Sequence, residues 1–364
     1  LDPTPWLYDA IRLQTENRPG EALHALQKSI ELNDNRAVYR SRQGLDEDRA
    51  ARGTSLGRIY DDLGFNQLGV NEASKSLTLD TANASAHRFL SDSYQGVRRR
   101  EIARVSELLQ AQLLQDVNIN PVQPSISETN LNIVTRGGPA DVGFNEFTPL
   151  FERNQVQLNT SGFAGDEDTF GGEGVVSALY DQFSISAGAF HYETDGWRPN
   201  HDINHDIYNA YAQYAVTPEL NLQLELRHRE STQGDLAFNF DPTDFRPDFE
   251  RTLNQDIARA GLRYSPTPNS DFLLSVIYSD REDEESDLFV FDEFSVGTDF
   301  LADDEGYQIE GQYLYRRERF NLTAGFAYTG VDTTFVDSFA IIPDPPDVIT
   351  TDSEITHPHG YVYG

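Results

Sequence analysis

The chain has 364 residues and a mass of 41.0 kDa, which is long enough for two or three domains. Its 28 basic and 60 acidic residues give a formal net charge of −32, which excludes nucleic acid as a partner because phosphate contacts need a basic surface. The absence of cysteine excludes disulfide scaffolds, zinc–thiolate sites and thiol nucleophiles.

Composition divides the chain into two parts. Residues 1–150 carry 20 acidic and 16 basic residues, whereas residues 151–364 carry 40 acidic and 12 basic residues and are rich in Tyr, Phe and Gly. The sequence contains no run of about 18 apolar residues, so it predicts no transmembrane helix. The mean hydropathy of −0.55 is compatible with a soluble protein, but also with a transmembrane β-barrel, whose strands alternate apolar and polar residues.

The N-terminal part contains an internal repeat. Residues 50–83 and 84–117 align at a spacing of 34, and residues 3–36 give a third copy. Small residues recur where two helices would cross, and large residues recur where successive helix pairs would pack. The residues that carry this pattern are Trp6, Ala22, Leu56, Gly57, Tyr60, Gly69, Leu90, Tyr94 and Ala103.

The pattern resembles the tetratricopeptide repeat, a pair of antiparallel helices. Asp34 and Thr81 depart from that repeat, which normally ends in proline. A generic bundle of helical hairpins would produce the same spacing of small and large residues. Either arrangement implies protein contact or scaffolding, because such repeats carry no chemistry of their own.

Proline and glycine interrupt regular structure after the repeats, at Pro121, Pro124 and 137–139. We therefore expect a helical repeat domain over 1–117, a linker over 118–150 and a β-domain over 151–364.

The β-domain alternates apolar and polar residues over about ten residues, the length of a tilted strand that crosses a bilayer. On residues 220–229, Leu222 and Leu224 point to one side, and Glu225 and Arg227 point to the other. Comparable segments lie at 154–164, 174–181, 183–193, 207–216, 256–265, 271–279, 307–316, 320–329 and 360–364. Short turns between them alternate with long polar loops, expected at 194–206, 230–255, 280–306 and 330–359, which is typical of outer-membrane barrels.

The fold class predicted from these patterns is α + β in separate domains, with helical repeats followed by an antiparallel transmembrane β-barrel. Ten strands are visible, and we expect the barrel to continue beyond residue 364 because every strand edge must be paired in a membrane. The absence of Met at position 1 likewise indicates a trimmed chain. The alternative is a soluble β-sandwich, although its strands are usually five or six residues long.

Polar residues on the predicted strands would line a hydrated lumen. These pore-lining candidates are Gln157, Gln223, Glu225, Arg227, Arg263, Glu310 and Arg316. They could pair with one another across neighbouring strands or contact a hydrophilic cargo.

The sequence contains no recognisable catalytic set, since the G-x-S-x-G, Walker and H-E-x-x-H motifs are absent, and we expect no enzymatic activity and no resident cofactor. Residues 280–305 hold 12 carboxylates, and calcium could use such oxygens, but the spacing is not that of an EF-hand and a solvated acidic loop explains them as well. His201 with His205 and His357 with His359 form pairs that leave a metal site open.

The order of repeats, linker and barrel resembles exopolysaccharide export porins, such as those for cellulose and poly-N-acetylglucosamine, and surface lipoprotein assembly modulators. The resemblance implies an outer-membrane export pore or secretion scaffold, surrounded by outer-membrane lipid. Its periplasmic repeat domain would recruit a periplasmic or secreted protein or a polysaccharide cargo.

Two rival functions remain open. The first is an outer-membrane anchor that assembles surface structures through its repeats and loops without transport. The second is an uptake receptor driven from the inner membrane, although that family carries a plug domain of well over a hundred residues, for which 118–150 is too short.

Overall fold

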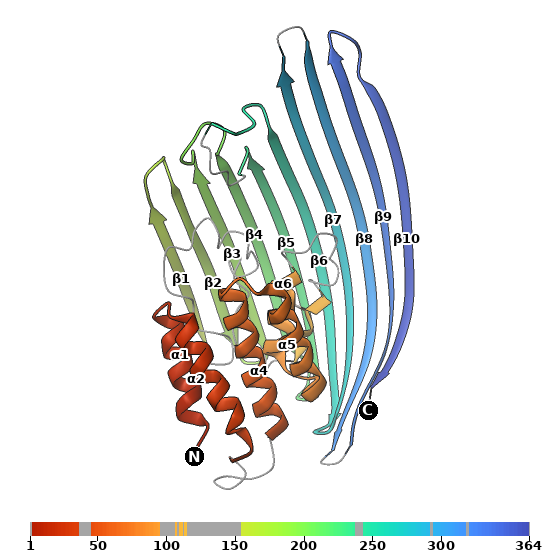
Figure 1. The fold of residues 1–364 in the computed structure, drawn as a ribbon. Coiled ribbons are helices and arrows are strands. Elements are labelled where there is room, and N and C mark those ends of the chain that lie inside the picture. The colour runs from red at the N-terminus through yellow and green to blue at the C-terminus, as the bar shows by residue number, and fades with distance from the viewer. Residues whose placement is uncertain are drawn as a thin grey trace.

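The structure is a computed structural model in which helices precede one large antiparallel sheet (Figure 1). It describes residues 2–35, 45–94, 106–107, 109–111, 113–114, 154–236, 243–291, 294–317 and 320–363. The predicted linker over 118–150 and the repeat residue Ala103 lie outside these described residues.

The helices are α1 (Thr4–Thr15), α2 (Pro19–Glu31), the 3-10 helix η1 (Asn33–Asn35), α4 (Leu45–Asp62), α5 (Asn66–Leu79) and α6 (Ala84–Tyr94). The predicted repeat copy over 3–36 corresponds to α1 and α2, and the copy over 50–83 corresponds to α4 and α5. Among the described residues, no helix combines the length and the apolar character needed to cross a membrane.

Small residues set the distance between the helices, as the repeat pattern predicts. A Cβ added to Gly69 of α5 would lie 2.9 Å from the carbonyl oxygen of Gly57 in α4, which is closer than a side chain allows. Ala22 and Leu56 are buried in one apolar cluster against which Tyr60 packs, and Leu90 is buried in a second cluster with Tyr94 beside it.

Trp6 departs from its predicted packing role. Its side chain is 38% exposed near the start of α1, where no earlier helix pair covers it in the described part of the chain. Helical hairpins are therefore present, whereas their identity as tetratricopeptide repeats stays a prediction.

The sheet is a meander in which each strand pairs with the next, in the order β1 to β10. Its strands are β1 (Gln155–Ala164), β2 (Phe170–Tyr180), β3 (Phe183–Thr194), β4 (Ile203–Ala215), β5 (Leu220–Gln233), β6 (Glu250–Thr267), β7 (Ser270–Val290), β8 (Ser295–Arg317), β9 (Phe320–Ile342) and β10 (Asp347–Tyr363). Each of these strands overlaps a segment that the alternation predicts.

The long polar loops predicted at 280–306 and 330–359 are wrong. These residues extend β7, β8, β9 and β10, and the ladder between β7 and β8 is continuous from Ser270 to Val290. Asp and Glu are depleted in strands, so a run of these residues predicts a loop. Here the complete backbone ladder and ion pairs such as Arg251–Asp283, at 2.7 Å, override that propensity.

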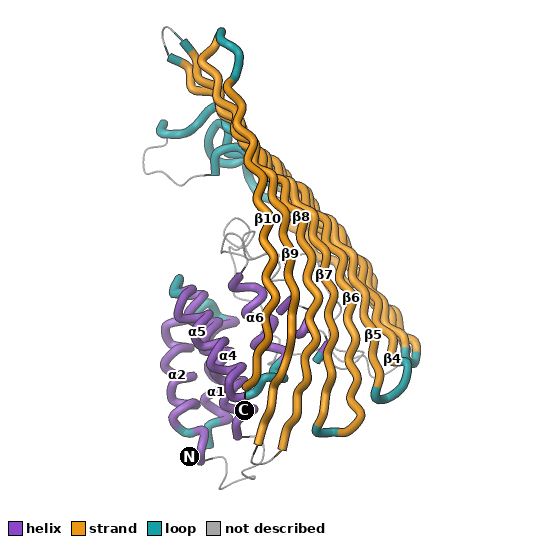
Figure 2. The backbone as a smooth tube through the Cα atoms, turned by 90° about the vertical axis from the view of Figure 1, so that its right-hand side faces the viewer, coloured by secondary structure: helices purple, strands orange, loops and turns teal. Residues whose placement is uncertain are grey.

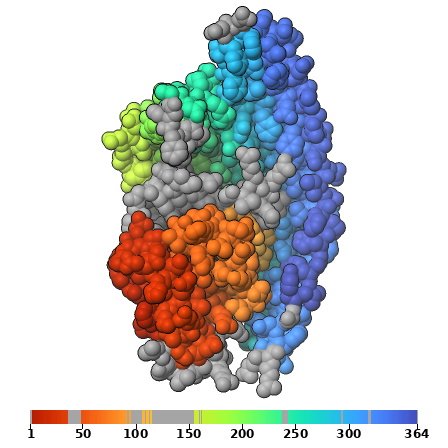
Figure 3. Space-filling view, in the orientation of Figure 1, coloured from red at the N-terminus to blue at the C-terminus, as the bar shows by residue number. Residues whose placement is uncertain are grey.

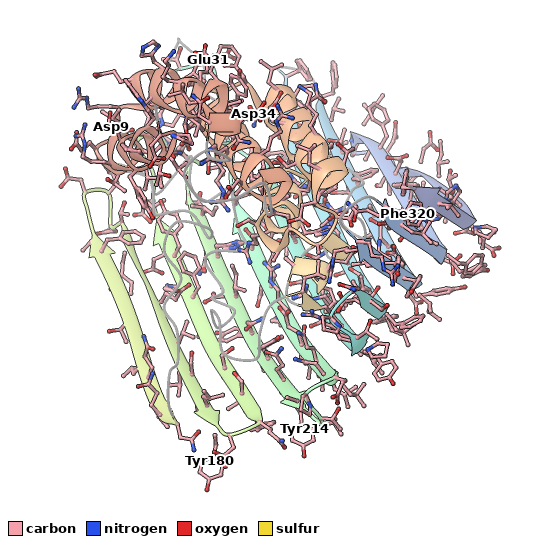
Figure 4. All side chains as sticks on the ribbon, turned by 90° about the horizontal axis from the view of Figure 1, so that it is seen from below. Asp9, Glu31, Asp34, Tyr180, Tyr214 and Phe320 are labelled. Carbon is pink, nitrogen blue, oxygen red and sulfur yellow. The ribbon has the colours of Figure 1, made fainter. Side chains whose placement is uncertain are left out.

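The helices lie against one side of the curved sheet (Figure 2). We call this side the inner face and the opposite side the outer face. Seen from below, Tyr180 and Tyr214 at the lower turns point away from the helices (Figure 4). On β5, Gln223, Glu225 and Arg227 are buried on the inner face, and Leu222, Leu224 and Leu226 are exposed on the outer face, so the predicted alternation is confirmed.

Candidate functional site

The outer face carries a continuous apolar band. One row of residues in register across the ten strands consists of Val156, Ala178, Ile185, Ala212, Leu224, Ala260, Val276, Ile309, Tyr328 and Pro358. Exposed aromatic residues border the band, with Tyr264 and Phe272 on its lower side and Tyr278 and Tyr307 on its upper side. From Phe272 to Tyr278, the band is about 20 Å tall at about 3.3 Å per residue.

Directly above Tyr278 and Tyr307, the outer face becomes acidic. On β6 to β10, the next row in register consists of Asp256, Asp280, Glu305, Asp332 and Glu354. Partial burial and the neighbouring carboxylates raise the pKa of Asp280 above its ordinary value. Like charges on adjacent strands repel one another, so this row requires contact with water. The outer face thus changes from apolar to aqueous within one row.

Around β5 the inner face is polar and hydrogen-bonded, whereas Phe190, Tyr192, Ile203 and Ile207 form a buried apolar cluster on the same face of β3 and β4. Glu225 on β5 and Arg259 on β6 form an ion pair in which each side chain is only 2% exposed. Asn209 on β4 donates a hydrogen bond from Nδ2 to Glu225 Oε1 at 2.7 Å. Gln223 and Arg227 are buried on either side of Glu225, and Gln157 is half-buried on β1. Such a surface suits water and polar solutes rather than lipid.

A further segment, described at 106–107, 109–111 and 113–114, packs against this face; all of these residues but 114 are helical, and we call it the helical segment at 106–114. Its Leu109 and Leu113 are fully buried in a cluster with four strand residues, Ile257, Leu273, Ile277 and Leu314. A Cβ added to Gly261 would lie 2.8 Å from the Leu113 side chain, so the glycine leaves room for the leucine. The segment therefore covers the lower part of the inner face of β6, β7 and β8.

Polar contacts surround this apolar cluster. Ser106 donates to Glu310 at 3.2 Å, and Tyr361 donates to the same carboxylate at 2.6 Å. Arg263 donates to the carbonyl oxygens of Leu113 and Leu114 at 3.4 and 3.3 Å. Carbonyl oxygens at the end of a helical turn lack intrahelical partners, and a cation satisfies them.

Asp271 connects two of the predicted pore-lining residues. It pairs with Arg263 at 2.9 Å and with Arg316 through its other oxygen. The structure therefore places Arg263 and Glu310 against the helical segment and links Arg316 to Arg263 through Asp271. Gln223, Glu225 and Arg227 lie on the neighbouring inner face. Sequence reasoning missed Asp271, although it lies on the same alternating side, and it had no signal for the contact of residues 106–114.

The helical segment is also tied to the helices. His87 of α6 lies 2.5 Å from a Glu107 oxygen through Nδ1 and 3.1 Å from the Thr81 carbonyl oxygen through Nε2. Burial opposes protonation of His87, but Glu107 and the carbonyl outweigh it and hold the pKa of His87 above its ordinary value. Thr323 on β9 donates to the Thr81 hydroxyl at 3.2 Å, which links the helices directly to the sheet.

The residues that left a metal site open in the sequence do not form a metal-binding group in the part of the chain that the structure describes. Across the described ranges, no three His, Cys, Asp or Glu side chains form a group that could hold a metal ion. His205 lies in β4, and His357 and His359 lie in β10, rather than in loops. A calcium site among residues 280–305, which lie mostly on β7 and β8, stays a prediction.

The chain matches no protein-family model and no curated protein sequence. It is similar to the ferric citrate transporter FecA in its unliganded form, at 11% identity and a TM-score of 0.40 over 57% of this chain and 34% of FecA. FpvA of P. aeruginosa bound to heterologous pyoverdines gives 9% identity and a TM-score of 0.46 over 57% of this chain and 34% of FpvA. The chain is also similar to the ferric yersiniabactin uptake receptor FyuA from Yersinia pestis, at 11% identity and a TM-score of 0.41 over 57% of this chain and 38% of FyuA.

The chain thus covers 34% to 38% of the length of these three proteins. Similarity at such TM-scores and identities carries no argument about fold or function, both of which rest on the geometry of the chain itself.

Proposed function

We propose that the chain belongs to an outer-membrane transport protein in which the ten strands form part of a β-barrel wall. The observation that carries this proposal is the outer apolar band, bordered by aromatic residues and ending at the acidic row of Asp280 and Glu305. Barrels of this class carry an outward apolar belt about 25 Å tall between aromatic girdles. A soluble sheet would leave the same surface exposed to water.

The strand connections support one orientation. The turn between β6 and β7 is short and lies at the end of the sheet near the helices (Figure 1), whereas the connections from β3 to β4 and from β5 to β6, at the opposite end, are longer. Outer-membrane barrels have short periplasmic turns and longer extracellular loops. The helices are then periplasmic, and the extended ends of β7 to β10 lie outside the cell.

Within this orientation, the inner face provides the path for a hydrophilic cargo. Gln223, Glu225 and Arg227 are buried in this structure and would offer polar groups to water and solute once they are uncovered. The periplasmic helices, as tetratricopeptide-like repeats, recruit a protein or polysaccharide for export. The helical segment at 106–114 closes the lower part of this path and must move for transport.

An anchor without transport is the second candidate, and the same helical segment favours it. A barrel whose inner face is permanently covered by Leu109 and Leu113 would hold the repeats at the membrane and conduct nothing.

Planar-bilayer conductance of the purified protein separates the two functions. Leu113→Asp buries a charge in the apolar cluster, so it should release the segment and raise the mean conductance several-fold. Leu68→Asp is the control, since Leu68 is 48% exposed on α5. It should leave conductance unchanged.

A disulfide lock tests the same movement in reverse. Gln308 Nε2 donates to Ser106 Oγ at 3.3 Å, and the long glutamine side chain separates the two backbones by more than a direct disulfide spans. Ser106→Cys with Gln308→Cys should therefore be joined by a short bifunctional methanethiosulfonate reagent, which forms a reducible disulfide with each thiol, in a chain that has no native cysteine. The crosslinked pair should suppress the conductance of the Leu113→Asp protein, and reduction should restore it. If no variant conducts, whether crosslinked or reduced, only the anchor function is left.

A further inference from the structure

The extended ends of β7 to β10 carry a second apolar surface, separate from the outer band. They project beyond the other strands and stand clear of the helices (Figures 1 and 3). On their inner face lies a group of apolar side chains, which we call the inner tip strip. Its members are Phe289, Val296, Phe300, Phe335, Phe339, Ile341 and Ile349.

The strip is continuous across the four strands. Val296 of β8 is in register with Phe289 of β7 and with Ile341 of β9. The rings of Phe300 and Phe335 lie 6.0 Å apart between centroids. Phe339, Ile341 and Ile349 are 48%, 47% and 64% exposed. Contiguous exposed apolar surface of this kind marks an interaction site, and it lies on the opposite face of the sheet from the lipid-facing band.

Carboxylates lie within the strip. Asp347 is in register with Phe339, and Asp337 is in register with Ile349 and with Phe300. Glu285 and Asp287 lie nearby, but Arg251 and Arg246 pair with them at 3.4 Å. Within the described part of the chain, no basic side chain lies within ion-pair distance of Asp337 or Asp347. The strip therefore combines apolar contact area with uncompensated negative charge.

We propose that the inner tip strip binds a partner polypeptide segment that presents apolar and basic side chains together. Apolar side chains of the partner would cover Phe339 and Ile341, and its basic side chains would meet Asp337 and Asp347. Complementary charge favours this partner over a second copy of the chain, whose own strip carries the same negative charge. It also favours a basic segment over anionic lipid headgroups. The proposal does not depend on transport through the barrel.

A matched pair of variants tests the proposal. Ile341 and Ile342 are adjacent on β9 and are 47% and 46% exposed, but they lie on opposite faces. The probe is a short fluorescent peptide of alternating valine and lysine, measured by anisotropy against the purified protein. Ile341→Ser should weaken binding about tenfold, because it removes one apolar contact side chain, whereas Ile342→Ser should leave it unchanged.

Charge is tested in parallel. Asp347→Asn should weaken binding of the valine–lysine peptide, and added salt should weaken that binding further. A valine–glutamate peptide should not bind. Circular dichroism of each variant must show an intact sheet. Equal affinity in the Ile341→Ser and Ile342→Ser proteins would overturn the proposal, because the peptide would then bind elsewhere on this acidic chain.

Two further outcomes would also overturn it. Binding of zwitterionic vesicles that is lost in Ile341→Ser would assign the strip to lipid. Sedimentation that shows a dimer in the parent protein and a monomer in Ile341→Ser would assign it to a second copy. Absence of conductance, which would remove the transport function, leaves this test unaffected.

Discussion

Ile185→Arg should prevent stable folding into a bilayer, whereas Ser184→Arg on the same strand should be tolerated. Ile185 is 43% exposed and lies in the middle row of the outer band, in register with Ala212. An arginine that faces the lipid belt of a barrel costs up to about 2–4 kcal/mol, the value at the midplane. Ser184 lies on the inner face, half-buried and in register with Gln213, so a charged side chain there faces the polar side of the sheet rather than lipid.

The measurement is urea-dependent unfolding from lipid vesicles, followed by tryptophan fluorescence and by the gel shift of folded barrels. Leu224→Arg should behave like Ile185→Arg, because Leu224 lies in the same row, next to Ala212. If Ile185→Arg and Ser184→Arg were equally stable, the outer band would not face lipid.

The second large effect concerns the buried ion pair. Arg259→Ala should lower the free energy of unfolding by about 3–5 kcal/mol, because it removes the buried arginine that pairs with the buried Glu225 carboxylate. The Asn209 hydrogen bond to Glu225 would remain, but it does not neutralise the charge. The same urea titration in vesicles measures the loss.

Two variants control this experiment. Replacing both partners, by Glu225→Gln with Arg259→Met, should recover most of the stability, since the two opposite charges of the pair are removed together. Arg12→Ala removes a half-exposed arginine that pairs with Asp9 on α1, and it should leave the unfolding free energy almost unchanged. A double variant as unstable as Arg259→Ala would show that shape, rather than charge, determines the stability of this site.

Much of the sheet follows from alternation alone. Because successive side chains of a strand point to opposite faces, the period of two in residues 220–229 placed Leu224 and Glu225 on the correct sides before their neighbours were known. The same argument grouped Glu310 with Arg316 on β8. Glycines at 57 and 69 predicted the close crossing of α4 and α5 because few other residues permit it.

The remaining features depend on contacts that local patterns do not encode. The length of β7 and β8 comes from pairing between carboxylate-rich segments, and intrinsic preference alone would make them loops. The docking of Leu109 and Leu113 joins residues about 150 positions apart in sequence, Leu113 and Arg263 among them. Trp6 was assigned a packing role from its position in a repeat, whereas the burial of its side chain depends on what covers α1.

Collision accessibility of nitroxide labels along β8 tests the central claim most directly, that the outer band lies in a bilayer. In vesicles, a label replacing Ile309 should collide most with dissolved oxygen and least with a water-soluble nickel chelate. A label replacing Glu305, in the acidic row, should show the reverse order, with Tyr307 between them. If the label at Ile309 met the nickel chelate as often as the label at Glu305, the outer band would be in water and the barrel account would be wrong.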